Sequence, residues 1–217
     1  MSTIKAPNPL RAVLFDWDGT LVDTAEASFR CYVRMFASFG IEFDRETYAR
    51  TYSPNWYHTF ECVGLAREHW SEADTRWLAH FATETVSLLP SALPALDALR
   101  RHGVRRGIVT SGGRERVSRE LVAHGVHEHF EHVVFGDDVP HKKPHPDPLH
   151  LCLSRLGIDA AHAAYIGDSP EDVLMARAAG VYAIGVRGAY PNVAALEAAG
   201  AHAIAEDVGA AVEMLVG

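Results

Sequence analysis

The chain has 217 residues, 48% of them hydrophobic, which is enough for one good core and a smaller second domain. Its formal net charge of −8 argues against a nucleic-acid partner, because binding to a phosphate backbone needs a basic surface. The three cysteines form no C-x-x-C pair, residues 1–10 lack the apolar run of a signal peptide, and no stretch approaches the roughly 20 apolar residues of a membrane span. We therefore expect a cytoplasmic protein, a monomer or a homodimer, that binds neither nucleic acid nor membrane.

A short apolar strand, residues 12–15, opens the chain and stops abruptly at a polar cluster. Asp16 and Asp18 lie two residues apart directly after it. Extended backbone would place both carboxylates on the same side, where they repel each other unless a cation lies between them or one is protonated. One carboxylate could then hold Mg²⁺ and attack phosphorus while the other protonates a leaving oxygen. A plain turn explains the same D-x-D-G-T string equally well.

Residues 22–89 differ in character from the rest of the chain and indicate an all-helical insertion. Apolar residues recur at helical spacing up to Gly40, a short second helix follows, and residues 72–88 are predicted to form a long third helix. Its inward-facing residues are expected to be Trp77, Leu78, Phe81 and Val86. Residues 51–58 contain serine and proline and are expected to form a loop. The predicted domains are 1–21 with 90–217 for the core and 22–89 for a helical cap.

From residue 90 onward, helices and strands alternate. Apolar strands are predicted to end at Val109, Phe135, Ile166 and Val186. This alternation implies right-handed crossovers and a parallel sheet, so the predicted fold class is α/β, a Rossmann-like doubly wound parallel sheet that carries the helical insertion. Polar clusters follow four of the strands, and the one after the third strand contains Asp137 and Asp138. Because the carboxyl ends of parallel strands meet at one edge, we expect one crevice.

The crevice would combine carboxylates, hydroxyls and an amine. Thr110 and Ser111 precede two glycines and a helix whose N-terminal N–H groups can bind an anion. Lys143 follows the third strand in a proline-stiffened loop, and an ammonium there can grip a phosphate oxygen. Asp168 and Asp172 follow the fourth strand, and Asp168 can reach the metal of the first cluster. The pattern therefore predicts a Mg²⁺-dependent phosphoryl-transfer site.

Seven of the thirteen histidines lie between His124 and His150, which raises the alternative of a second metal site. Zinc sites favour close histidine pairs supported by cysteine or acidic ligands. The histidines from His124 to His132 instead surround a helix end and a loop. We expect exposed or helix-capping roles for them.

Together, the four clusters resemble the haloacid dehalogenase-like hydrolase superfamily, in particular its phosphoglycolate-phosphatase-like and β-phosphoglucomutase-like members with a helical cap after the first motif. Asp16-x-Asp18-Gly-Thr is similar to the first motif, and Thr110-Ser111 is similar to the second. Lys143-Pro144 is similar to the third motif, and Gly167-Asp168-Ser169-x-x-Asp172 is similar to the fourth. Order and spacing agree from Arg11 to the C-terminal helices.

The resemblance implies a role for each motif residue. Asp16 would be the nucleophile that forms an aspartyl-phosphate. Asp18 would be the general acid/base, and its backbone carbonyl would also bind Mg²⁺. Asp168 would ligate the metal directly, with Asp172 behind it. The residues that would hold the phosphoryl oxygens are Thr110, Ser111 and Lys143.

Three functions remain open. The first is hydrolysis of a small, soluble phosphate monoester, with phosphoglycolate-like acids or sugar phosphates ahead of nucleotides. The second is a sugar phosphomutase, which shares every motif. Mutases of this kind typically carry threonine before Asp23, where this chain has Val22, and this favours hydrolysis. The third is a phospho-accepting signalling or binding domain, which the helical insertion and the second carboxylate, Asp18, disfavour.

Substrate selectivity is expected to come from the insertion, because the core groups would act on any phosphate monoester. In the predicted loop, Asn55 and His58 could hydrogen-bond a leaving group. Trp56 and Tyr57 could wall it, or they could instead pack inside the insertion.

Overall fold

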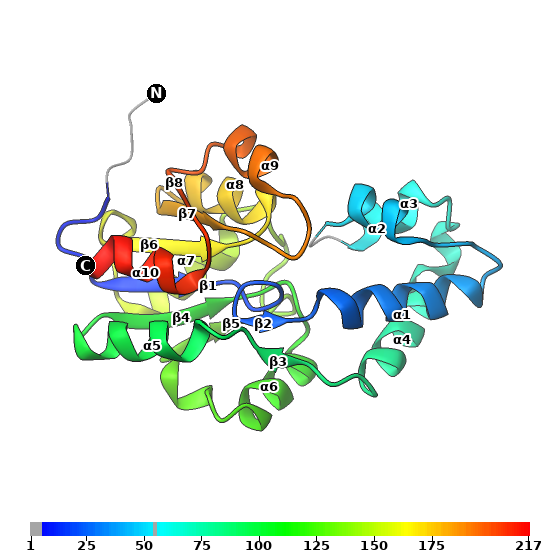
Figure 1. Ribbon diagram of the computed structural model, residues 1–217, viewed down its shortest axis with the longest axis horizontal. Helices are drawn as coiled ribbons and strands as arrows, with labels where there is room; N and C mark the ends of the chain where they lie inside the picture. The colour runs from blue at the N-terminus through cyan, green and yellow to red at the C-terminus, as the bar shows by residue number, and fades with distance from the viewer. Residues whose placement is uncertain (1–5, 54–55) are drawn as a thin grey trace. The chain divides into compact units, whose positions relative to one another are not determined.

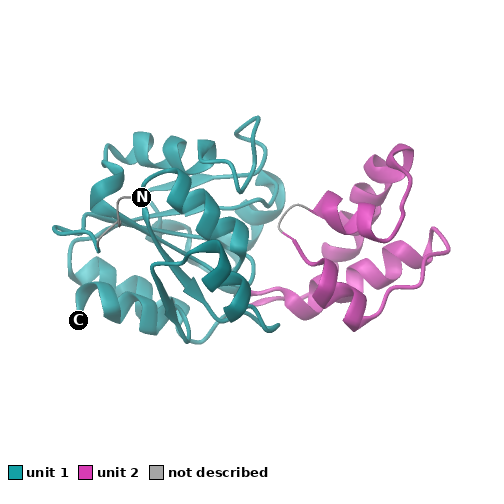
Figure 2. Cartoon of the chain, turned by 90° about the horizontal axis from the view of Figure 1, so that it is seen from above, with its two compact units in different colours: residues 1–22, 88–217 teal, residues 23–87 magenta. Residues whose placement is uncertain are grey.

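The computed structural model describes residues 6–53 and 56–217, and the chain divides into two compact units (Figure 2). One unit comprises residues 1–22 and 88–217, and the other comprises residues 23–87. The first unit contains a six-stranded sheet with helices, whereas the second is mainly helical.

A six-stranded parallel sheet forms the centre of the first unit (Figure 1). In spatial order, its strands are β5 (His132–Val134), β4 (Arg105–Val109), β1 (Ala12–Phe15), β6 (Ala163–Gly167), β7 (Tyr182–Val186) and β8 (Ala203–Ala205). Every neighbouring pair runs parallel. The chain winds from β1 out to β5 and then returns to β6 on the other side, so the strand order reverses at β1. The doubly wound α/β fold class is confirmed, and this switch point is where such sheets bind ligands.

Strand β1 occupies the centre because all four of its residues are apolar and fully buried. Both faces of a central parallel strand are covered by helices, so a continuous apolar run suits this place. Leu14 belongs to a core cluster with Leu149 and Tyr165. The next residue, Phe15, packs edge-on against Phe130, with ring centroids 6.5 Å apart.

Helices cover both faces of this sheet (Figure 2). They are α5 (Ala92–Arg101), α6 (Arg114–Ala123), α7 (Asp147–Leu156), α8 (Pro170–Ala178), α9 (Val193–Ala199) and α10 (Val208–Val216), with short 3₁₀ turns η2 (His127–His129) and η3 (Ala160–His162). Leu153 of α7, Val173 of α8 and Leu196 of α9 share one apolar cluster with the sheet. Helix α5 packs on β4 and α10.

The second unit consists of α1 (Ala25–Ala37), α2 (Arg45–Thr51), α3 (Trp56–Cys62), the 3₁₀ turn η1 (Arg67–His69) and α4 (Trp70–Phe81). Aromatic side chains fill its interior. The ring of Tyr32 lies 5.7 Å from that of Phe43 and 5.6 Å from that of Tyr48. Each such pair contributes roughly 0.5–1.5 kcal/mol beyond burial alone, so this small unit has a core of its own.

The prediction of one helix over residues 72–88 is wrong, because α4 ends at Phe81. The hydroxyl of Thr83 donates to the carbonyl of His80, which satisfies an acceptor at the helix end. Glu84 then binds Arg30 and Arg34 of α1, which draws the chain off the helical path. The prediction that Leu78 faces inward is also wrong, because this residue is 49% exposed.

The chain passes between the units through two short paired strands, β2 (Val22–Asp23) and β3 (Ser87–Leu88). Beside them, the N–H of Leu89 donates to the carbonyl of Leu21 at 2.9 Å. The sequence pattern gave no strand here, since each strand has only two residues. The insertion therefore leaves and re-enters the core at neighbouring points.

No helix in the described ranges is long and apolar enough to cross a membrane, and the longest, α1, has 13 residues. The cysteines are free thiols. Cys31 and Cys152 are buried and Cys62 is exposed.

Candidate active site

A tight turn after β1 places Asp16 at the carboxyl edge of the sheet. The N–H of Asp16 still belongs to the parallel ladder and donates to Ile166 at 2.9 Å. Two residues later the chain reverses, because the carbonyl of Trp17 accepts from both Leu21 and Val22. The Asp16 carboxylate is thereby held at the switch point, with the residue only 7% exposed.

The buried ammonium of Lys143 joins two of the predicted site carboxylates. Its Nζ lies 2.6 Å from Oδ1 of Asp16 and 2.7 Å from Oδ1 of Asp172, and the residue is 4% exposed. Burial alone lowers the pKa of Lys143, but the two carboxylates outweigh it and raise the pKa above its usual value. The lysine is therefore held charged between segments that are 127 and 29 residues away from it.

Asp168 completes a group of three carboxylates. Asp16, Asp168 and Asp172 each offer an oxygen, and these three atoms lie within 4.8 Å of one another. Burial raises the pKa of Asp16 to about 7; Lys143 opposes this effect, while Asp172 and Asp18 add to it. Burial, with Asp16 and Asp172, also raises the pKa of Asp168 well above its usual value. Oxygen donors at high negative charge density fit a hard divalent cation such as Mg²⁺.

Asp172 differs from the other two because donors surround its carboxylate. Its Oδ1 accepts from Lys143 at 2.7 Å and from Tyr165 at 3.0 Å. Its Oδ2 accepts from the hydroxyl and the N–H of Ser169, and the Ser169 hydroxyl in turn caps α8. A carboxylate has about four acceptor positions, so this capping box leaves Asp172 little capacity for a further ligand.

The expectation that Asp16 and Asp18 share one space is only partly met. The two oxygens of Asp18 accept from Arg116 of α6 at 2.9 and 2.5 Å, and Asp18 does not belong to the described three-carboxylate group. Arg116 also lies 3.2 Å from Glu120, and Glu120 accepts from the indole N–H of Trp17 at 2.7 Å. Trp17 lies between the two aspartates in the sequence. A chain of side-chain contacts thus runs from Trp17 through Glu120 and Arg116 to Asp18.

Arg116 and Glu120 were not predicted from the sequence. Spaced four residues apart on a helix, they have the pattern of an ordinary exposed ion pair. Both are instead 8% exposed. Burial lowers the pKa of Arg116, but Asp18 and Glu120 outweigh it and raise the pKa above the usual value. Burial raises the pKa of Glu120, and Asp18 adds to this, although Arg116 opposes it.

Thr110 and Ser111 follow β4, directly beside β1 in the sheet. Thr110 is 3% exposed, and its hydroxyl accepts from the N–H of Gly112 at 3.0 Å. Ser111 is half-buried, and its carbonyl lies so close to Gly136 that a Cβ there would meet it at 2.2 Å. The glycine after β5 is therefore needed for this loop to approach.

The carboxylates after β5 do not join the crevice as expected. Asp137 accepts from the N–H of Arg114 at 2.9 Å, at the start of α6. Asp138 pairs with the side chain of Arg114 and lies 3.6 Å from Arg155. Asp137 and Asp138 therefore hold this loop against the N-terminus of α6. One of the N–H groups in the first turn of α6 is already hydrogen-bonded to Asp137 and is not free to bind a ligand.

The predicted selectivity residues lie in the second unit. Asn55 is outside the described residues. Trp56 and His58 do not lie in a loop, because α3 begins at Trp56. The indole of Trp56 and the hydroxyl of Tyr57 both donate to Asp74 of α4, at 2.6 and 2.7 Å. His58 is exposed, with a ring nitrogen 3.5 Å from Cys62 Sγ.

Two further residues support the carboxylate group and were not predicted. Thr20 donates its hydroxyl to Oδ1 of Asp168 at 3.1 Å. The side-chain amide of Asn192 donates to the backbone carbonyls of Asp168 and Val186, at 2.7 and 2.9 Å. Thr20 is part of the D-x-D-G-T string, whereas nothing near Asn192 in the sequence marks it.

Comparison with known proteins agrees with this arrangement. The sequence model of the haloacid dehalogenase-like hydrolases matches residues 13–186. The chain is 36% identical to the pyrophosphatase PpaX of Bacillus velezensis over 179 residues, covering 81% of this chain and 82% of that protein. It is 35% identical to the phosphoglycolate phosphatase of Yersinia pestis over 191 residues, covering 83% of this chain and 82% of that protein.

A solved structure shares the fold as well. CbbY from Rhodobacter sphaeroides in complex with phosphate is 25% identical, with a TM-score of 0.77 over 92% of this chain and 95% of that one. The family match extends from β1 through β7 and includes each of the four polar clusters. This chain belongs to the haloacid dehalogenase-like hydrolase family.

Proposed function

We propose that the protein is a Mg²⁺-dependent phosphatase that hydrolyses a small phosphate monoester through an aspartyl-phosphate intermediate on Asp16. The observation that carries the proposal is the buried group in which Lys143 bridges Asp16 and Asp172, with Asp168 beside them. Phosphatases among the relatives support the class of reaction. A monomer or homodimer in the cytoplasm remains part of the proposal.

In the first step, a carboxylate oxygen of Asp16 attacks phosphorus and the ester P–O bond breaks. The leaving alkoxide takes a proton from Asp18. In the second step, Asp18 takes a proton from water, the water oxygen attacks phosphorus, and the bond to Asp16 breaks to release orthophosphate. Lys143, Thr110 and Ser111 bind the phosphoryl oxygens through both steps.

Asp16, Asp168 and the backbone carbonyl of Asp18 would hold Mg²⁺. The bound cation would supply positive charge that offsets carboxylate repulsion and the charge on the phosphoryl group. Asp172, whose oxygens are already engaged by Lys143, Tyr165 and Ser169, would act by orienting its neighbours.

Arg116 would act as a positioning residue for Asp18. Its two nitrogens bind both oxygens of that carboxylate, and Glu120 fixes the guanidinium from behind. A two-point contact restricts the orientation of a carboxylate more than a single point charge can. Proton transfer by Asp18 then requires one of these contacts to loosen.

Residues 22–89 would act as the cap that sets substrate preference, and the selectivity residues expected from the sequence are Asn55, Trp56 and His58. The expected substrates are phosphoglycolate-like acids or sugar phosphates. Trp56 would contribute a ring edge only, because its N–H is engaged by Asp74.

The direct test is phosphate release from p-nitrophenyl phosphate with and without Mg²⁺, followed by a panel of phosphorylated metabolites. Free phosphate formed in proportion to substrate consumed supports the phosphatase. Formation of an isomeric sugar phosphate with no release of phosphate would instead support a phosphomutase and contradict the phosphatase proposal. No turnover under either condition would reject both.

Mg²⁺ is expected to raise the melting temperature of the free protein, because it would offset repulsion among buried carboxylates. At a hundred times its dissociation constant, a ligand adds about 2.7 kcal/mol of stability. Asp168→Asn should remove most of this shift in a thermal melt. Asp159→Asn is the matched control, because that exposed aspartate caps no helix through its side chain. An equal Mg²⁺ shift in wild type and Asp168→Asn would contradict the metal assignment.

Gly19→Ala is expected to lower both stability and activity. Gly19 has a φ of +80°, and a Cβ there would lie 2.5 Å from Oδ2 of Asp168. The left-handed backbone alone costs about 1–2 kcal/mol for a non-glycine residue. Gly103→Ala separates the two effects, because Gly103 has a φ of +67° but open space around it. Urea unfolding should show a loss of stability in both variants, larger in Gly19→Ala because of the added overlap with Asp168, whereas kcat should fall only in Gly19→Ala.

A further inference from the structure

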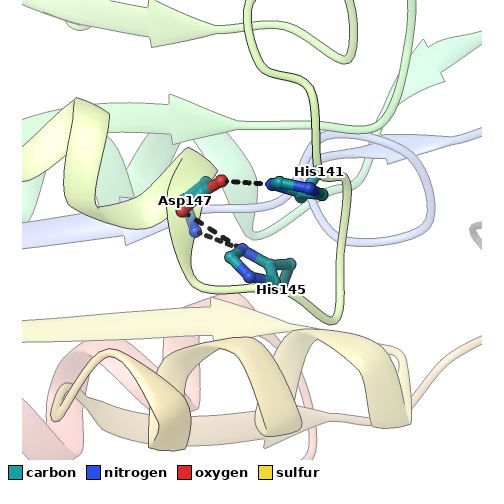
Figure 3. Close-up of side chains that lie close together, drawn as sticks. All are labelled: His141, His145 and Asp147. Carbon is teal, nitrogen blue, oxygen red and sulfur yellow. Dashed lines mark hydrogen bonds and ion pairs between the residues drawn. The ribbon is translucent and has the colours of Figure 1, made fainter.

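A second group of metal-ligating side chains lies on the segment between β5 and α7. His141, His145 and Asp147 each offer one ligand atom, and these atoms lie within 4.8 Å of one another. Figure 3 shows both imidazole rings directed at the carboxylate. Nδ1 of His141 lies 2.8 Å from Oδ2 of Asp147, and Nδ1 of His145 lies 3.2 Å from Oδ1.

These separations suit a small tetrahedral ion. With metal–ligand bonds of 2.0–2.2 Å, the edge of a tetrahedron is about 3.3–3.6 Å. The two nitrogen–oxygen distances, 3.2 and 2.8 Å, both lie below this range, so the side chains would have to rotate slightly apart to admit an ion. Two histidines and one carboxylate are also a known zinc donor set, which leaves a fourth position for water.

The three ligands are fixed by local structure and open to solvent. Asp147 is the first residue of α7, Pro146 precedes it, and the N–H of His145 closes a turn on the carbonyl of Lys142 at 2.9 Å. His141 and His145 are exposed, with ring centroids 4.6 Å apart. An ion therefore has an entry path and an anionic ligand.

We propose that His141, His145 and Asp147 form a binding site for a divalent transition-metal ion of the Zn²⁺ type, separate from the carboxylate group at Asp16. Imidazole nitrogen favours Zn²⁺, Ni²⁺ and Cu²⁺ over Mg²⁺, whereas the all-oxygen group favours Mg²⁺. The donor chemistry therefore assigns different ions to the two sites. The sequence raised the alternative of a second metal site among the seven histidines from His124 to His150, and the proposal assigns it to His141 and His145.

The test is a calorimetric titration of tag-free protein with Zn²⁺ in a large excess of Mg²⁺, which occupies the carboxylate group. One Zn²⁺ should bind per chain. His145→Ala and Asp147→Asn should each weaken binding by about tenfold or more. His102→Ala is the matched control, since that exposed histidine contacts only a backbone carbonyl, and it should bind as wild type does.

A second readout locates the ion without using activity. Anomalous diffraction from a Zn²⁺-soaked crystal should show a peak between the two imidazoles and Asp147. A peak only at Asp16 and Asp168, or unchanged Zn²⁺ affinity in both variants, would overturn the proposal. Because binding is measured rather than turnover, neither outcome depends on the proposed phosphatase activity.

Discussion

Replacing Asp16 by asparagine is expected to abolish phosphate release while the fold remains intact. The amide nitrogen cannot attack phosphorus, so the covalent route is closed. Loss of a nucleophile typically lowers kcat by about 10⁴-fold or more. The substitution also removes one of several buried negative charges, and Lys143 keeps its contact with Asp172. The melting temperature without Mg²⁺ should therefore stay equal or rise.

The matched control for Asp16→Asn is Asp137→Asn. Asp137 also follows a strand of the sheet, but its carboxylate accepts from the N–H of Arg114 at the start of α6. The asparagine oxygen can accept the same hydrogen bond, so both stability and turnover should stay close to those of the wild type. Intact-mass analysis after rapid quenching should detect a phosphorylated wild-type chain and none in Asp16→Asn. Wild-type turnover in Asp16→Asn would refute the mechanism.

Disrupting the Arg116 contact is expected to reduce kcat most for substrates with poor leaving groups. General acid catalysis contributes about 10²–10⁴-fold, and a nitrophenolate leaving group needs it least. If Arg116 positions Asp18, an alkyl phosphate should lose at least about ten times more kcat than p-nitrophenyl phosphate. A purely structural role would lower both rates by the same factor.

The choice of variant matters, because Arg116→Met alone leaves the carboxylates of Asp18 and Glu120 without their cation. Breaking a buried ion pair in this way costs about 3–5 kcal/mol and could unfold the chain. The double variant Arg116→Met with Glu120→Gln removes both buried charges, and the glutamine oxygen still accepts from Trp17. A double variant that folds and retains wild-type kcat for both esters would rule out the positioning role. Arg116→Lys should recover part of the rate, since lysine restores charge but not the two-point contact.

Five strands of the main sheet could be predicted as apolar runs, and polar clusters follow four of them. The ends of β1, β4 and β7 agree with the sequence, and those of β5 and β6 differ by one residue. The end of α4 could not be predicted in this way. Thr83 to Val86 continue an apparently helical pattern, but Glu84 is bound by Arg30 and Arg34. Contacts from 50 and more residues away therefore overrode the local pattern.

The candidate site was predictable where one strand end supplies each group. Asp16, Lys143, Asp168 and Asp172 come together because the parallel order of strands brings their loops to one edge. Arg116 was not predictable, since 98 residues separate it from Asp18 and its spacing from Glu120 suggests an exposed pair. Asp137 and Asp138, in contrast, were predicted to join the crevice and do not. They have the right residue type and position, but nearby arginines and a helix terminus already use their oxygens.

The pairing of β2 with β3 brings the two ends of residues 24–86 next to each other. Paired strands lie roughly 5 Å apart, so any polypeptide whose two ends meet could be spliced in there without altering the order of the main sheet. Closing a longer loop costs little additional entropy, because the cost grows only with the logarithm of its length. Under the proposed division of roles, exchange of this whole module during evolution would change selectivity while the groups at the edge of the main sheet stay the same.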